Sequence, residues 1–321
     1  MCATCGCESE KKATILNLQT GAETTVVYDS EPHRHVEGHI HADHLHDHSH
    51  ARPHGPASED AGVGHNAGPG HQHAHDDHHE HAHRHEDHQH DNHFKPSPGA
   101  TVELDMRILA KNDALAAKNR AWFAGREILA LNLVSSPGAG KTTLLERTIR
   151  DLRQELRLFV VEGDQATSND GERILAAGAP VIQVNTGAGC HLDADMVARG
   201  LAQLRPETGS VVMIENVGNL ICPALFDLGE RAKIVVLSVT EGEDKPLKYP
   251  HIFRAANLVI LNKRDLLPHL DFDVARVIAN VREVNPDIIV LKVSARSGEG
   301  LDAWYDWIRQ EASRMRDAAF T

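Results

Sequence analysis

The stretch Ser135-Ser136-Pro137-Gly138-Ala139-Gly140-Lys141-Thr142-Thr143 decides the fold that we expect for this chain. It follows the apolar run Ile128–Val134 and precedes a segment with helical spacing of apolar residues, at Leu145, Ile149, Leu152 and Leu156. The order is therefore strand, glycine-rich turn and helix. Glycines lack a Cβ, so backbone N–H groups can approach a phosphate closely, and the start of the helix adds its positive dipole. The stretch predicts a binding site for a polyphosphate.

The same stretch matches the Walker A pattern G-x-x-x-x-G-K-[ST], with Ser135 at the position of the first glycine. The pattern places Lys141 at the β- and γ-phosphates and the Thr142 hydroxyl on Mg²⁺. The binding residues expected in this cradle are Ser136, Gly138, Ala139, Gly140, Lys141, Thr142 and Thr143. A chance glycine turn between a strand and a helix is the alternative, and a second nucleotide motif argues against it.

That second motif is Asn262-Lys263-Arg264-Asp265, which follows the apolar run Leu258–Leu261 and resembles the N-K-x-D element of GTPases. A carboxylate at Asp265 can accept hydrogen bonds from the N1–H and the amine of guanine, a donor pair that adenine lacks. Ser294-Ala295-Arg296 resembles the loop that closes over the same base. We therefore expect GTP, with its base held by Asn262, Lys263, Asp265, Ser294 and Ala295.

Apolar strand-like runs alternate with helix-like segments along the second part of the chain. The runs are Ile128–Val134, Leu158–Glu162, Val181–Asn185, Val211–Glu215, Ile234–Val239, Leu258–Leu261 and Ile288–Val293. This alternation predicts an α/β fold of the P-loop NTPase type, with a mostly parallel sheet flanked by helices. Ligands in such folds bind beyond the carboxyl ends of the strands.

Two acidic segments follow strands at that edge of the predicted sheet. They are Glu162-Gly163-Asp164 and Glu215-Asn216-Val217-Gly218, and the second resembles the D-x-x-G switch element with Glu in place of Asp. Carboxylates there can hold Mg²⁺ or a water molecule. We predict a catalytic group of Lys141, Thr142, Asp164 and Glu215. Plain surface carboxylates are the alternative.

Histidine is concentrated in one segment, because 21 of the 24 histidines lie between His33 and His93. Large apolar residues are almost absent there, and 11 acidic against 3 basic residues carry most of the formal net charge of −13. We expect a disordered tail that binds Ni²⁺, Zn²⁺ or Cu²⁺. An inert linker or a purification tag is the alternative.

Five cysteines form two candidate metal sites. Cys2, Cys5 and Cys7 lie within six residues and can surround a soft metal ion, although a redox C-x-x-C is the alternative. Cys190, His191 and Cys222 follow strands of the same sheet edge and can share one ion, with buried structural cysteines as the alternative. A fourth ligand could come from a second copy of the chain.

The composition divides the chain into three parts. We expect residues 1–99 to form the tail with its cysteine motif and residues 126–321 to form the P-loop domain. Between them, residues 100–125 are expected to form an amphipathic helix that packs on the domain and runs from about Val102 to Phe123. Residues 11–30 are undecided between strand and helix.

No basic cluster suggests nucleic acid, and no apolar run reaches the ~18 residues of a membrane span. The start of the chain lacks the features of a signal peptide, so we expect a cytoplasmic protein.

Together these motifs resemble the HypB family of hydrogenase nickel-incorporation GTPases, which is related to the urease and cobalamin metallochaperones. The segments that carry the resemblance are C-x-x-C-G-C, the histidine-rich insert, SSPGAGKTT, VVEGDQAT, GAGCHL, ENVGNLICP, EGEDKPLKYP and NKRD. The resemblance implies nickel at Cys2, Cys5 and Cys7, and nickel or zinc at Cys190, His191 and Cys222. It also implies a GTP-promoted homodimer, with a HypA-type zinc protein and the large subunit of a [NiFe] hydrogenase as partners.

The function expected from these observations is a GTP-hydrolysing metallochaperone that stores nickel and delivers it to a hydrogenase. The alternative is a nickel or zinc buffer whose nucleotide-binding domain takes no part in delivery.

Overall fold

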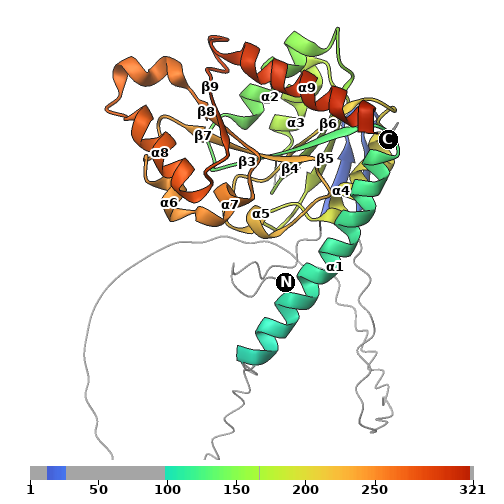
Figure 1. Ribbon diagram of the computed structural model, residues 1–321. Helices are drawn as coiled ribbons and strands as arrows, with labels where there is room; N and C mark the ends of the chain where they lie inside the picture. Colours follow the sequence, from blue (N-terminus) through green and yellow to red (C-terminus); the bar gives the residue numbers. More distant parts are fainter. Residues whose placement is uncertain (1–12, 27–97, 166, 319–321) are drawn as a thin grey trace, which may run out of the picture. The chain divides into compact units, whose positions relative to one another are not determined.

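A computed structural model describes residues 13–26, 98–165 and 167–318, which form one nine-stranded sheet with helices on both faces (Figure 1). The strand order is β2-β1-β5-β4-β6-β3-β7-β8-β9. The strands are β1 (Thr14–Asn17), β2 (Ala22–Thr25), β3 (Leu129–Ser135), β4 (Leu158–Asp164), β5 (Val181–Asn185), β6 (Val211–Glu215), β7 (Ala232–Ser238), β8 (Leu258–Asn262) and β9 (Ile289–Lys292). Strands β3 to β9 run parallel, which confirms the predicted α/β architecture.

Helices connect these strands and cover the two faces of the sheet. They are α1 (Pro98–Ala124), α2 (Lys141–Leu152), α3 (Asn169–Ala177), α4 (Ala194–Leu204), α5 (Cys222–Leu225), α6 (Lys245–Lys248), α7 (Pro250–Ala255), η1 (Arg264–His269), α8 (Val274–Val284) and α9 (Leu301–Ala318). Helix α2 ends before Leu156, which we expected on the helix; Leu156 instead packs against the same core from the turn that follows. Among the residues described, no helix combines the length and the apolar character needed to cross a bilayer.

The core has two layers, one on each face of the sheet. Leu129, Leu131 and Leu133 of β3 pack with residues of α2, α3 and α9. The intervening Ala130 and Val134 lie in clusters on the opposite face, which include residues of α4, α7 and α8. Because both faces are covered, the central strands are apolar at nearly every position, and this is why the sequence shows them as continuous apolar runs.

The hairpin β1–β2 comes from the part of the chain that the sequence placed in the N-terminal tail, and the sequence left its structure undecided. Strand β1 pairs antiparallel with β5, and β2 forms the edge of the sheet. Ile15 is buried and packs in the same cluster as Ile182 and Val184 of β5. The hairpin therefore belongs to the sheet of the nucleotide-binding domain.

Helix α1 spans the predicted helix and packs on the domain through a stripe of apolar and amide side chains. Its buried positions are Asn112, Ala116, Asn119 and Phe123, which recur at helical spacing. Among the α1 side chains that the structure describes, two of these four buried positions carry amides and two are apolar. These amides form hydrogen bonds with main-chain groups of the domain, which satisfies their buried polar atoms beside the apolar packing of Phe123.

The α1 amides bind two loops of the domain. Asn119 Nδ2 donates to the carbonyls of Ala194 and Leu228, at 2.8 and 3.0 Å. Asn112 Nδ2 donates to the carbonyl of Asp227 at 2.8 Å, and Asn112 Oδ1 accepts from the N–H of Ala194 at 3.0 Å. Helix α1 thus links the segment that begins α4 to the segment that follows α5.

Candidate nucleotide and metal sites

The glycine-rich turn between β3 and α2 forms a cradle at the carboxyl end of the sheet. Gly140 has φ of 96°, and a Cβ at this position would lie 2.6 Å from Nδ2 of Asn262, so only glycine fits. Lys141 Nζ donates a hydrogen bond to Ser135 Oγ at 2.8 Å. Burial lowers the pKa of Lys141, and the nearby charge of Glu215 opposes that effect. The cradle therefore holds a desolvated cation where phosphate oxygens would lie.

Two carboxyl groups lie buried next to this cradle. Glu162 and Glu215 are paired in register on β4 and β6, and Thr142 Oγ1 donates to Glu215 Oε1 at 2.7 Å. Burial raises the pKa of Glu215 to about 7, with Lys141 opposing the increase. Burial also raises the pKa of Glu162 well above its ordinary value, and the charge of Glu215 adds to this effect.

The donor set of this acidic pair fits a divalent cation. Within the described part of the chain, Oε2 of Glu162 and Oε2 of Glu215 accept no hydrogen bond although both are buried. An unsatisfied buried oxygen is costly, and Mg²⁺ prefers oxygen ligands that also neutralise its charge. These oxygens, with the Thr142 hydroxyl, are the groups that would hold Mg²⁺ beside the phosphates.

Glu162 is a residue that the predicted catalytic group did not contain. The sequence placed it beside Asp164 at the end of a strand, but only the register of β4 against β6 brings it opposite Glu215. Asp164 has a different environment, since its carboxylate accepts from the N–H of Gln165 at 2.6 Å and from the N–H of Thr167 at 3.0 Å. Asp164 shapes the following loop, and its catalytic role stays a prediction.

Four of the five predicted base-binding residues, all except Ser294, line a pocket of about 310 Å³. It is lined by Gly140, Thr143, Asn262, Lys263, Asp265, Leu266, Ala295 and Arg296. Asn262 bridges its two sides, because Nδ2 donates to the carbonyl of Ala139 and Oδ1 accepts from the N–H of Ala295, both at 3.0 Å. Ser294 Oγ donates to Asp265 Oδ1, which orients the carboxylate expected to bind guanine. The structure thus brings together the cradle and base segments predicted from sequence.

Cys190, His191 and Cys222 form a compact cluster beside the cradle. The two Sγ atoms are 3.0 Å apart, Cys190 Sγ lies 3.7 Å from His191 Nδ1, and the ligand atoms of all three residues lie within 4.8 Å of one another. Burial lowers the pKa of His191 to about 4, so its imidazole is neutral at pH 7, the form that binds metals. Two thiols and an imidazole suit zinc or nickel.

Two other predicted metal-binding segments lie outside the described residues. These are the cysteine motif, with Cys2, Cys5 and Cys7, and the histidine-rich segment His33–His93. Both stay predictions.

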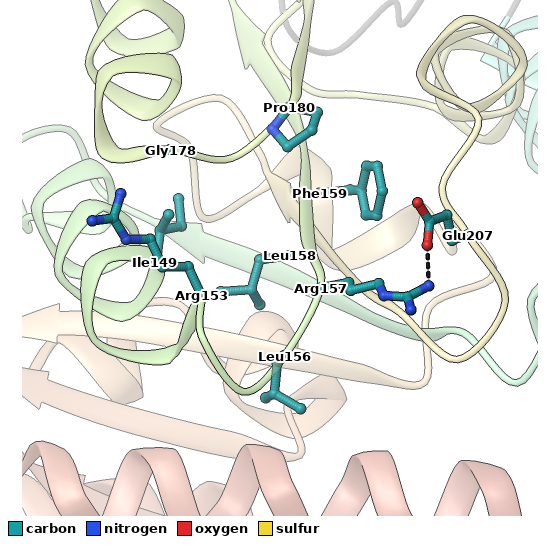
Figure 2. A pocket seen from close by; sticks show the side chains of 9 residues that line it. All are labelled: Ile149, Arg153, Leu156, Arg157, Leu158, Phe159, Gly178, Pro180 and Glu207. Carbon is teal, nitrogen blue, oxygen red and sulfur yellow. Dashed lines mark hydrogen bonds and ion pairs between the residues drawn. The ribbon is translucent and has the colours of Figure 1, made fainter.

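A second pocket, of about 200 Å³, lies beside the amino end of β4 (Figure 2). It is lined by Ile149, Arg153, Leu156, Arg157, Leu158, Phe159, Gly178, Pro180 and Glu207. Arg157 and Glu207 form an ion pair on one side of it, and none of the predicted site residues lines it. The chemistry predicted from sequence lies at the carboxyl ends of the strands instead.

The parallel sheet, the phosphate cradle and the base pocket define a P-loop nucleotide-binding protein. A family described as "CobW/HypB/UreG, nucleotide-binding domain" matches residues 129–292. The chain belongs to this family, and within it to the HypB hydrogenase maturation factors.

Individual relatives support that assignment. The hydrogenase maturation factor HypB of Rhizobium leguminosarum bv. viciae is 60% identical over 213 residues, covering 66% of this chain and 71% of the relative. HypB of Azotobacter chroococcum mcd 1 is 59% identical over 221 residues, covering 68% and 72%. The crystal structure of HypB from Helicobacter pylori in complex with nickel is similar with a TM-score of 0.60 and 35% identity, covering 64% of this chain and 96% of that one.

Proposed function

We propose that the protein hydrolyses GTP and uses the hydrolysis cycle to bind and deliver nickel during maturation of a [NiFe] hydrogenase. Its family and the base pocket support GTP as the nucleotide. The nickel bound to the Helicobacter pylori relative, together with the cluster of Cys190, His191 and Cys222, supports nickel as the cargo.

One observation carries the proposal: a single short segment, residues 215–222, borders both the phosphate cradle and the metal cluster. At its start Glu215 accepts the hydroxyl hydrogen bond of Thr142, and at its end Cys222 lies in the cluster. Between them, Gly218 packs so closely on the cradle that a Cβ there would lie 3.1 Å from Cγ of Pro137. A change in the cradle that moves this segment must therefore move a metal ligand.

The segment also binds the loop that carries the other two ligands. Asn219 Nδ2 donates to the carbonyl of Cys190 at 3.3 Å. Asn216 Oδ1 accepts from the N–H of Leu192, directly after His191, at 3.1 Å. The segment 215–222 would therefore respond both to the bound nucleotide and to the metal ion. If it does, thermodynamic linkage requires the nucleotide to change the affinity for the metal by the same factor by which the metal changes the affinity for the nucleotide.

For hydrolysis, the chain would act mainly by positioning and by neutralising charge. Lys141 would neutralise the γ-phosphate, and Thr142 and Glu215 would hold Mg²⁺, with Glu162 adjacent. When bound, Mg²⁺ would supply charge neutralisation on the β- and γ-phosphates. Asp265 would select guanine. The proposed partners of this cycle are a HypA-type zinc protein, a hydrogenase large subunit and a second copy of the chain. Zinc is proposed as an alternative ion at Cys190, His191 and Cys222.

The test uses the full chain with Cys2, Cys5 and Cys7 replaced by Ser, so that absorption from thiolate-bound nickel reports on Cys190 and Cys222. The parent should release phosphate from GTP. Lys141→Ala should lose at least 100-fold in turnover, because the cation acts on developing phosphate charge, and should keep the nickel absorption. Lys248→Ala, an exposed lysine, is the matched control and should keep both.

Cys222→Ala should show the reverse pattern, with the nickel absorption weaker than in the parent and GTP turnover retained. A parent chain that binds GTP but does not hydrolyse it would make the protein a nucleotide-binding metal buffer. That result would overturn the proposal.

A further inference from the structure

A row of buried polar side chains crosses the apolar sheet behind the metal cluster. Asn132, Asn216, Glu230 and Lys233 are each at most 9% exposed, and we refer to them as the inner polar row. Asn216 Nδ2 donates to Asn132 Oδ1 at 3.3 Å, and Asn132 Nδ2 donates to Glu230 Oε1 at 3.0 Å. Lys233 Nζ lies 3.6 Å from Glu230 Oε1. Polar groups in such an interior are costly unless they are paired, and this row is paired throughout.

One end of the row holds the segment that carries Cys222. Lys233 Nζ donates to the carbonyls of Pro223 and Phe226, at 2.7 and 3.1 Å. Pro223 directly follows Cys222, and the Phe226 ring lies against the His191 ring with the centroids 4.0 Å apart. Helix α5 has only four residues, too few to be stable on its own, so its position depends on contacts of this kind.

The other end of the row holds the segment that carries His191. Asn216 Oδ1 accepts from the N–H of Leu192, the residue after His191. Asn216 itself follows Glu215, which receives the hydrogen bond of Thr142. The row therefore connects both metal-binding segments with each other and with the edge of the phosphate cradle.

Stability alone does not account for the pair of Glu230 and Lys233. A buried ion pair can often be replaced by apolar residues of similar volume without loss of stability, because desolvation of the charges offsets their attraction. What apolar residues cannot do is donate hydrogen bonds to two carbonyls at fixed points. The hydrogen bonds of the inner polar row hold the backbone of both metal-binding segments in place.

We propose that Asn132, Glu230 and Lys233 are positioning residues of the metal site, which hold Cys222 and His191 at the separation that one metal ion requires. The inference rests on the proposed metal-binding function of Cys190, His191 and Cys222. None of the three positioning residues binds the metal itself. Residues that orient metal ligands commonly change metal affinity 10- to 100-fold when they are replaced, and we expect an effect of about this size.

The experiment uses the full chain with Cys2, Cys5 and Cys7 replaced by Ser. Nickel is titrated in a chelator buffer that fixes the free nickel concentration, and the thiolate-to-nickel absorption is recorded, since the histidine-rich segment contributes no thiolate. Lys233→Met removes the donor to α5. The double variant Glu230→Gln/Lys233→Met also removes the second charge, keeps an acceptor for Asn132, and leaves no lone buried charge that would hinder folding.

The matched control is Thr148→Val. Thr148 is fully buried on the opposite face of the sheet and accepts a hydrogen bond from Trp304 Nε1 at 2.9 Å. This variant loses a buried hydrogen bond away from the metal cluster. Thermal unfolding and binding of a fluorescent GDP analogue are measured for every variant, so that stability and nucleotide binding are compared with metal binding.

We expect Lys233→Met and the double variant to weaken nickel binding about 10- to 100-fold and to alter the absorption spectrum, with GDP binding unchanged. Thr148→Val should lose stability and keep the nickel affinity. The inference would be overturned if the double variant had the nickel affinity and the spectrum of the parent. It would also be overturned if Thr148→Val lost as much nickel affinity as the double variant. If the parent absorption survives Cys222→Ala, the metal site itself is wrong, and the proposed function fails together with the inference.

Discussion

Replacing Glu215 with Gln is expected to stabilise the nucleotide-free protein near neutral pH while removing the negative charge of a proposed Mg²⁺ ligand. The pKa of Glu215 is raised from 4.5 to about 7 by burial. The native state therefore retains a proton that the unfolded chain loses near pH 4.5. Stability contributed by this group is fully present below pH 4.5 and falls as the pH rises towards 7. The difference between the two pKa values of Glu215 corresponds to about 3 kcal/mol in the free energy of unfolding, because each pKa unit is worth about 1.4 kcal/mol.

The assay is denaturant unfolding of the full chain, without metal or nucleotide, at several values between pH 4.5 and 8. Glu215→Gln should match the parent near pH 4.5, where both side chains are neutral, and should be more stable by about 3 kcal/mol at pH 8. Glu103→Gln, in an exposed ion pair with Arg107, is the control and should change stability by about 1 kcal/mol or less. If parent and Glu215→Gln show the same pH dependence, Glu215 is not a buried, proton-retaining carboxyl.

Two further predictions concern the base pocket and the tail. Asp265→Asn should weaken GTP binding by several orders of magnitude, because sites built around hydrogen-bond partners discriminate by about 10⁴- to 10⁵-fold. The variant should bind xanthosine triphosphate in preference to GTP. Unchanged GTP affinity in a direct titration would reject the proposed base site. Deleting His33–His93 should lower the number of nickel ions bound per chain, measured by metal analysis after dialysis, and leave GTP turnover unchanged; an undiminished metal count would make the segment a linker.

The strands from β3 to β8 could be predicted because they are largely buried on both faces, whereas the edge strand β9 is partly exposed. Each predicted run of apolar residues corresponds to a strand from β3 to β9, with ends that differ by a few residues. The polar motifs at their carboxyl ends could be placed for the same reason, since a parallel sheet gathers those ends at one edge. The cradle and the base segment, with Asn262 between them, follow from this rule.

What the sequence could not supply depends on register and on long-range hydrogen bonds. Glu162 becomes part of the acidic pair only because β4 lies beside β6 with that register. Lys233 lies next to Ala232 at the start of an apolar strand, where a lysine is expected to reach solvent, yet it is buried and bound to α5. The buried amides of α1 are another case, because their partners lie 75 or more residues away along the chain.

We propose that nucleotide state changes the affinity of the Cys190, His191 and Cys222 cluster for nickel. The most direct measurement is the nickel affinity of the full chain with Cys2, Cys5 and Cys7 replaced by Ser, read from thiolate-to-nickel absorption at fixed pH. It is made once with GDP and once with a non-hydrolysable GTP analogue. We predict a difference of about 5- to 150-fold, the usual range of coupling between two sites, and its loss in Cys222→Ala. Equal affinities in the two nucleotide states would contradict this coupling and leave a nucleotide-binding protein with a static metal site.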